Sequence, residues 1–217
     1  MLARVGRQIA FSLDSTASRA EHSLTHDKPR FAFFQVFQPR GGGKRQAPTF
    51  DVIAPGVAKH EEEIVLAPGA EPAADPNLVL RVAVAAAEYG LPIAPGTLRN
   101  LKKCPIGDRN WTDESRELFI RLLASGPALL NVWEDIDFID VPGKLIPEWL
   151  GVRNRPSASA AHRYTIDRHM VEVVTRLGRE TPSGGRYDDR HYEALLLAGI
   201  LHDIGKRPGV ALSLIHI

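Results

Sequence analysis

The spacing of apolar residues predicts a mainly α-helical chain. Between Asp75 and Gly90 they recur every three or four positions, at Leu78, Val82, Ala85, Ala86 and Tyr89. Such spacing places them on one face of a helix. Asp75-Pro76 is typical of a helix start and Gly90 of a helix end, so we expect one amphipathic helix here.

Two more helices follow by the same criterion. Thr112 is suited to cap the first of them, and Gly126-Pro127 is suited to end it. The residues expected to face inward are Leu118, Phe119, Leu122 and Leu123 in this helix, and Leu129, Val132, Trp133 and Ile136 in the next. A short helix in KLIPEWLG then leads to a Pro/Ser/Ala-rich stretch at 156–161, which we interpret as a linker.

Short β-prone runs precede these helices, at Phe50–Ile53, Val57–His60 and Ile64–Leu66. They predict a small hairpin that turns at the glutamates 61–63. Because successive side chains of a strand point to opposite faces, a solvated turn explains these glutamates better than a metal site does. The expected fold class is mainly α: a helical region with a small β-hairpin, followed by the first helices of an all-α domain.

Charge is informative only locally. Residues 1–50 hold eight Lys/Arg against three acids, whereas the whole chain has a net charge of +1. The near-neutral total gives no electrostatic case for binding nucleic acid or an anionic membrane. Val5–Leu24 has helical potential, but QPRGGGKRQAP (38–48) has the composition of a flexible loop. We interpret its basic residues as solvated.

The composition also indicates a compartment. Cys104 is the single cysteine and cannot form an internal disulfide, which fits a reducing environment. The longest apolar run, Ala194–Leu201, is far too short to span a membrane, and the first 20 residues lack the apolar core of a secretory signal. We therefore expect a cytoplasmic protein that binds neither membrane nor nucleic acid.

Two helices near the end of the sequence carry the candidate chemistry. HRYTIDRHMVEVVTRLG (162–178) predicts a helix capped near Thr165. Its expected buried face consists of Ile166, Met170, Val173, Val174 and Leu177. His169 falls on that side, so its imidazole is expected to point inward. DDRHYEALLLAGILHDIGK (188–206) predicts a second helix that is apolar nearly all round from Ala194 to Leu201, and it is therefore expected to be central.

His202 and Asp203 stand at the end of this second helix, just before Gly205. A polar pair at the end of an apolar helix costs free energy unless something compensates for it, and a divalent cation does so. His169 is the expected third ligand. The ion would activate water for attack on a phosphorus centre, and Lys206 is placed to stabilise phosphate charge.

The individual residues also have plainer explanations. A buried histidine is usually a hydrogen-bonded core residue, and a His-Asp dipeptide is common by chance; only the whole combination is specific. His162 and His191 are interpreted as surface residues or as residues that contact a ligand side chain and not the metal ion itself. Tyr164 and Asp167 are interpreted as structural, although Asp167 is also suited to orient a ligand histidine.

These residues carry a resemblance to a known family. LLAGILHDIGK, with the upstream His169, resembles the HD-domain metal-dependent phosphohydrolases. HRYTIDRHMVEVV is similar to a narrower family, the bifunctional PII uridylyltransferases/uridylyl-removing enzymes, in which an H-x-[YF]-T-[VI]-D-x-H segment opens the HD domain. VGRQIAFSLDSTASRAEH, APGVAKHEEEIVLA, DPNLVLRVAVAAAEYGLPIAPGTLRNL and LIPEWLGVRNRP resemble the linker that precedes that domain. The resemblance covers most of the chain, and 162–206 is its most specific part.

The resemblance implies a function. Enzymes of this family attach UMP to a tyrosine of the PII signal protein when glutamine is scarce and remove it when glutamine is plentiful. His169, His202 and Asp203 match metal ligands, with Mn²⁺ or Mg²⁺ as the expected ion. Asp203 and Lys206, which closes the HDIGK motif, are the expected catalytic residues. The implied reaction is phosphodiester hydrolysis by metal-activated water, with PII as partner and glutamine as effector.

The resemblance also implies an internal piece of a longer protein. It assigns 1–155 to the linker region and 156–211 to a truncated N-terminal part of the HD domain. The nucleotidyltransferase signature, the later HD-domain Asp and the glutamine-sensing ACT domains have no counterpart here. Residues 212–217 (LSLIHI) look like a translated sequencing adapter, and we interpret them so rather than as a genuine apolar tail; His216 is therefore not considered a ligand. We therefore expect little or no hydrolase activity from this chain alone.

Two alternatives stay open at this point. A cyclic-dinucleotide phosphodiesterase of the HD-GYP type shares the HDIGK motif, although HRYTIDRH and the linker segments argue against it. A non-catalytic helical interaction module would use the His-Asp pair only as a structural element.

Overall fold

The computed structural model describes residues 49–107, 111–157, 164–178 and 189–207, together with residues 6, 9, 13, 16 and 17. The chain divides into two compact units, Met1–Thr49 and Phe50–Ile217. The five described residues of the first 48 are helical and exposed. The remainder of the expected N-terminal helix, the loop 38–48 and the tail 212–217 lie outside the described residues.

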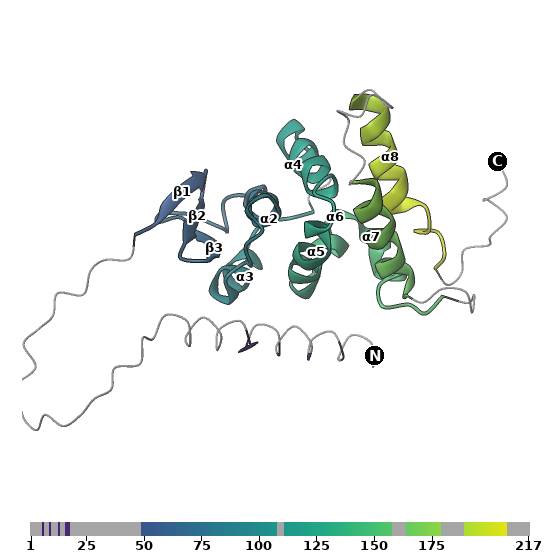
Figure 1. The fold of residues 1–217 in the computed structure, drawn as a ribbon, viewed down its shortest axis with the longest axis horizontal. Helices are drawn as coiled ribbons and strands as arrows, with labels where there is room; N and C mark the ends of the chain where they lie inside the picture. Colours follow the sequence, from purple (N-terminus) through teal and green to yellow (C-terminus); the bar gives the residue numbers. More distant parts are fainter. Residues whose placement is uncertain are drawn as a thin grey trace, which may run out of the picture. The chain divides into compact units, whose positions relative to one another are not determined.

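The second unit is mainly helical, as the sequence predicts (Figure 1). A three-stranded antiparallel sheet in the order β1-β2-β3 comes first along the chain. Its strands are β1 (Asp51–Ala54), β2 (Val57–His60) and β3 (Glu63–Leu66). The helices are α2 (Leu78–Tyr89), α3 (Pro95–Leu101), α4 (Asp113–Leu123), α5 (Ala128–Phe138), α6 (Val141–Leu145), the 3-10 helix η1 (Pro147–Gly151), α7 (Ile166–Leu177) and α8 (Asp189–Leu201).

The predicted hairpin is confirmed. Strands β2 and β3 pair antiparallel, and His60 opposite Glu63 closes the ladder. The turn is made by Glu61 and Glu62, which are both exposed, and Glu61 has a left-handed φ of 52°. The inner face of the sheet packs on α2, where Gly56 lets the backbone approach Leu78.

Helix α2 begins later than the sequence suggests. It starts at Leu78 rather than directly after Asp75-Pro76. The Asp75 carboxylate instead accepts a hydrogen bond from the Asn77 backbone N–H at 3.0 Å and pairs with Arg81, which holds the turn before the helix. Its end at Gly90, in the left-handed conformation, is confirmed. Tyr89 is wrongly assigned to the buried stripe, because half of its surface is exposed.

Helices α4 and α5 follow their apolar patterns closely. All eight residues expected to face inward are buried. Thr112 caps α4 as predicted: its hydroxyl oxygen accepts from the Ser115 N–H at 3.1 Å, while Ser115 Oγ accepts from the Thr112 N–H at 2.9 Å. This reciprocal arrangement satisfies two backbone donors at the helix start.

Charged residues fix α7 to the segment before it and to α5. Arg168 of α7 pairs with Glu134 of α5 at 2.8 Å. The buried Asp167 carboxylate accepts a hydrogen bond from the Asn154 backbone N–H at 2.8 Å. The Ile166 N–H donates to the Arg155 carbonyl at 2.9 Å. These contacts hold the first turn of α7, which carries His169, against α5 and the segment before it.

The buried face of α7 differs from the predicted one. Ile166, Met170 and Val174 are buried, but Val173 and Leu177 are only partly buried, and Val171 is buried instead. Val173 and Leu177 lie near Gly199 of α8, and this helix, which packs beside α7 (Figure 1), covers them incompletely.

Helix α8 is not central within the part of the chain that is described, which corrects the sequence-based expectation. It packs mainly on α7 and α4 through one side, with Leu196, Gly199 and Ile200 buried. Ala194, Ala198 and Leu201, spaced four and three residues apart, are exposed. Apolar residues on all sides of a helix show which residues can be buried. The neighbouring elements decide which of them are buried.

The contact between α7 and α8 depends on Gly199. A Cβ atom at this position would lie 2.9 Å from Leu177 Cδ1 and 3.1 Å from Val174 Cγ2. Both distances are shorter than an ordinary van der Waals contact. The absence of a side chain therefore allows the two helices to approach about one turn before His202.

We expect Gly199→Val to lower the free energy of unfolding by about 1–3 kcal/mol, because its side chain overfills this contact. Ala198→Val is the matched control, since it adds a β-branched side chain to the exposed face of the same helix. Urea unfolding of both variants measures the difference. Equal stability of the two would contradict the close-approach role of Gly199.

Asp135 is an unusual acid on α5. Burial raises the pKa of its carboxyl to about 7, and the negative charge of Glu134 adds to this, against the opposing hydrogen bond from the Ile93 backbone. Its unfolded value is about 3.9. Between these two values the folded state holds a proton that the unfolded chain has lost, so this group lowers stability as the pH rises through that window.

Asp135→Asn is therefore expected to change stability little at about pH 4 and to increase it by about 1–2 kcal/mol at about pH 8. Unfolding midpoints in urea at the two pH values test this. The exposed Glu117→Gln on α4 controls for the loss of one negative charge. A gain that is the same at both pH values would argue against a raised pKa at Asp135.

In the part of the chain that is described, none of the helices combines the length and the apolar character needed to cross a bilayer.

Candidate metal centre

His169, His202 and Asp203 come from two neighbouring helices. His169 lies in the first turns of α7, where its N–H donates to the Thr165 carbonyl at 2.8 Å. His202 and Asp203 follow the last residue of α8 and form a tight turn, in which the Ile204 N–H bonds to the Leu201 carbonyl at 3.0 Å. The packing of α7 on α8 brings the two ends together.

The three side chains form one cluster. Each offers a nitrogen or carboxylate oxygen atom, and these atoms all lie within 4.8 Å of one another. The rings of His169 and His202 have centroids 5.3 Å apart and are inclined at 75°. Among the described residues, this is the one group of three or more His, Cys, Asp or Glu side chains that meets this spacing.

A backbone contact fixes the orientation of His202. Its Nδ1 lies 2.8 Å from the carbonyl oxygen of Gly199. Because a carbonyl oxygen only accepts hydrogen bonds, Nδ1 carries the proton, and in the neutral tautomer that this contact selects Nε2 has the free lone pair. Nε2 faces Asp203 Oδ2 at 3.6 Å. This tautomer is the one that a metal ligand bound through Nε2 needs.

Asp203 is the buried member of the cluster. Its side chain is 12% exposed, against 36% for His202. Lys206 Nζ donates to Asp203 Oδ2 at 2.8 Å. The charge of the buried carboxylate is thus compensated by a lysine three residues later, a contact that the sequence analysis did not anticipate.

The donor set fits a divalent cation. Two imidazoles and one carboxylate are common ligands of first-row divalent metals. A histidine that binds a metal through one ring nitrogen usually donates a hydrogen bond from the other, and His202 Nδ1 makes this kind of contact with the Gly199 carbonyl. The partly exposed His202 leaves the cluster open on one side, as a catalytic site requires for its substrate.

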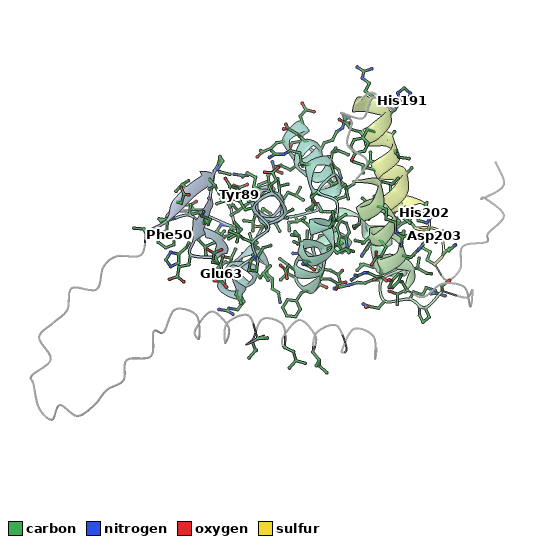
Figure 2. The ribbon with its side chains drawn as sticks, viewed as in Figure 1. Phe50, Glu63, Tyr89, His191, His202 and Asp203 are labelled. Atoms are coloured by element: carbon green, nitrogen blue, oxygen red, sulfur yellow. The ribbon has the colours of Figure 1, made fainter. Side chains whose placement is uncertain are left out.

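The weaker candidates separate from the cluster. His191 is exposed at the opposite end of α8 from His202 and Asp203 (Figure 2). Tyr164 is 37% exposed, and Asp167 is buried against the Asn154 backbone. His162 and His216 lie outside the described residues. The sequence analysis missed Gly199, although a carbonyl three residues before a histidine at a helix end is within reach of its ring.

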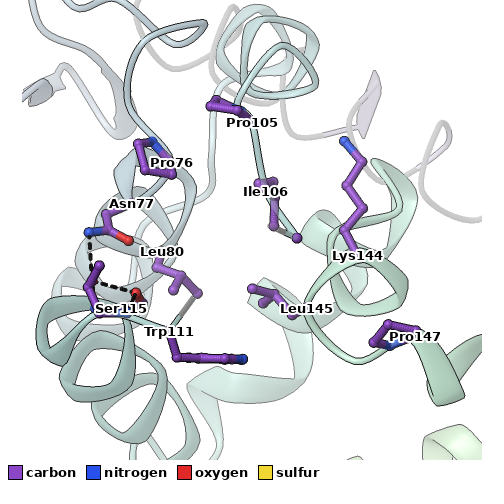
Figure 3. A pocket seen from close by; sticks show the side chains of 12 residues that line it. Pro76, Asn77, Leu80, Pro105, Ile106, Trp111, Ser115, Lys144, Leu145 and Pro147 are labelled. Atoms are coloured by element: carbon purple, nitrogen blue, oxygen red, sulfur yellow. Dashed lines mark hydrogen bonds between the residues drawn. The ribbon is translucent and has the colours of Figure 1, made fainter. Parts of the chain in front are cut away.

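A separate cavity of about 470 Å³ lies elsewhere in the second unit (Figure 3). Its lining includes Asn77, Leu80, Ile106, Trp111, Lys144 and Leu145. None of the described residues that line it is a His, Cys, Asp or Glu. It therefore offers no metal donors of these types, and the three clustered residues do not border it.

Comparison with curated proteins identifies relatives over most of the chain. A protein of Streptomyces coelicolor named bifunctional uridylyltransferase/uridylyl-removing enzyme is 36% identical over 202 residues, 92% of this chain and 23% of the relative. A protein of the same name from Mycobacterium tuberculosis is 39% identical over 155 residues, 71% of this chain and 19% of the relative. The Corynebacterium glutamicum protein of that name is 34% identical over 132 residues.

This chain is a relative of the bifunctional uridylyltransferase/uridylyl-removing enzymes. It spans about a quarter of the length of the uridylyltransferase from S. coelicolor. No family model matches the chain, and no solved structure matches it. The resemblance to these enzymes that was stated from HRYTIDRHMVEVV and the linker segments is confirmed by these relatives.

Proposed function

We propose that the chain carries part of the centre that removes UMP from a uridylylated PII signal protein. The convergence of His169, His202 and Asp203 within 4.8 Å is the observation that supports this proposal most directly. The printed names of the relatives include the uridylyl-removing activity. The scissile bond would be the phosphodiester between UMP and a tyrosine of PII.

The residues have distinct tasks in this proposal. A divalent cation, with Mn²⁺ or Mg²⁺ as the expected ion, would when bound supply an activated water as nucleophile and neutralise phosphate charge. His169 and His202 would hold the ion through ring nitrogens, and the Gly199 carbonyl keeps the proton of His202 on Nδ1. Asp203 contributes the negative charge. Lys206, 37% exposed at its side chain, is positioned to meet a phosphate oxygen.

The relatives favour this function over the alternatives. A cyclic-dinucleotide phosphodiesterase would share the HDIGK residues, but the similarity to uridylyltransferases extends over 92% of the chain, most of it outside that motif. A purely structural module has no need for three side chains with metal-binding atoms that converge within 4.8 Å. We infer that the parent protein is a cytoplasmic enzyme, with glutamine as an effector sensed by its ACT domains.

Metal binding provides the first test. We expect the chain to bind Mn²⁺, and His169→Ala, His202→Ala and Asp203→Asn each to weaken binding at least about 100-fold, because removal of even an outer partner costs 10–100-fold. Electron paramagnetic resonance of unbound Mn²⁺ measures the affinity. His191→Ala, at the opposite end of α8, is the matched control and should bind as the unaltered chain does. Unchanged affinity in all three variants would refute the site.

Activity is best tested in a longer protein. The segment of the S. coelicolor relative that aligns over 202 residues can be replaced by the matching residues of this chain, and UMP release from uridylylated PII followed with Mn²⁺ present. His202→Ala in this chimera should lower release at least about 100-fold while leaving uridylyl transfer intact, which also controls for folding. Equal loss of both activities, or loss of neither, would contradict the assignment of the hydrolytic step.

A further inference from the structure

The candidate metal centre already contains a positively charged group, the ammonium of Lys206. Among its three members only Asp203 carries a negative charge when the imidazoles are neutral, and Lys206 Nζ lies 2.8 Å from its Oδ2. That same oxygen is the one that faces His202 Nε2 at 3.6 Å. The lysine ammonium therefore holds the oxygen that points toward the space between the ligands.

The backbone places Lys206 there but leaves its side chain able to move. The Lys206 N–H bonds to the Asp203 carbonyl at 3.0 Å, so the turn after α8 fixes the two residues at i and i+3 spacing. Beyond that contact the lysine side chain is 37% exposed. A flexible four-carbon stem that ends near the surface can release its partner at a small cost.

We propose that Lys206 is a counter-ion that occupies Asp203 when no metal is bound and gives it up when a divalent cation enters. Two positive charges at one carboxylate oxygen repel each other. The lysine therefore either moves away when the metal binds or, if it stays, weakens the binding of the metal. The displaced ammonium would then face the phosphate of the substrate. This inference rests on the proposed metal site and adds a role for Lys206 in the resting state.

A supporting role for Lys206 would change the metal affinity in the opposite direction. If Lys206 served to orient Asp203 for the metal, as an outer hydrogen-bond partner does, its removal would loosen metal binding. A counter-ion that competes with the metal instead weakens binding, and its removal tightens it. The sign of the change in affinity thus separates the two roles.

The test measures Mn²⁺ affinity of the full 217-residue chain and its variants by electron paramagnetic resonance at a single, fixed pH of about 8, well above the usual pKa of a free imidazole. Lys206→Gln keeps most of the stem and removes the charge, and we expect it to bind Mn²⁺ about fivefold more tightly, the fold-change expected for losing one partly exposed ion pair. Lys206→Arg keeps the charge and should bind as the unaltered chain does. Far-UV circular dichroism and thermal unfolding verify that each variant is folded.

Arg207→Gln is the matched control. It removes the same charge one residue later, and Gln retains the Cβ, Cγ and Cδ positions with which Arg207 lies against Gly151. We expect its affinity to change less than about twofold, as for a charge without a direct partner at the site. An equal tightening in Arg207→Gln and Lys206→Gln would overturn the specific role of Lys206.

The remaining outcomes are also decisive. Unchanged or weaker Mn²⁺ binding by Lys206→Gln, with binding that still depends on His202, overturns the counter-ion role and leaves the metal site standing. Binding of Mn²⁺ to neither the unaltered chain nor Lys206→Gln overturns both proposals. Binding to Lys206→Gln alone supports the counter-ion role in its strongest form.

Discussion

The close approach of α7 and α8 at Gly199 is the constraint on which the candidate site depends. Leu177 and Val174 occupy the space that a side chain at this position would need. The same residue offers the carbonyl that holds His202 Nδ1. One glycine thus sets both the distance between the two helices and the orientation of one imidazole. His169 and His202 can converge because the helices that carry them are allowed to touch.

The elements that the sequence predicts well are those whose structure depends on interactions between residues close together in the chain. Thr112 caps α4 because its hydroxyl reaches the backbone three residues on, and the hairpin turns where two adjacent glutamates are solvated. The apolar residues of α4 and α5 are buried because these helices have neighbours that match their stripes. Local pattern and tertiary packing agree in these parts of the chain.

The parts that were missed depend on partners far away in the sequence. The exposed face of α8 at Ala198 and the partial burial of Val173 on α7 follow from which helices lie beside them, and periodicity does not report this. The raised pKa of Asp135 arises from the burial of its carboxyl in the folded chain, against the opposing hydrogen bond from the distant Ile93 backbone. The ion pair between Lys206 and Asp203 had a local signal, the spacing of three residues, but that signal acquires a meaning only once the carboxylate is known to be buried.

The donor atoms of the cluster bear on the choice of metal. Two imidazole nitrogens and one carboxylate form a set richer in nitrogen than Mg²⁺ prefers, since Mg²⁺ is usually held by oxygen ligands and water. Nitrogen donors favour Mn²⁺, Fe²⁺ or Zn²⁺ over it. Either ion would have to displace the Lys206 ammonium from Asp203, so that cost does not distinguish two ions of the same charge and the nitrogen donors decide between them. Of the two ions expected from the sequence, this argument favours Mn²⁺.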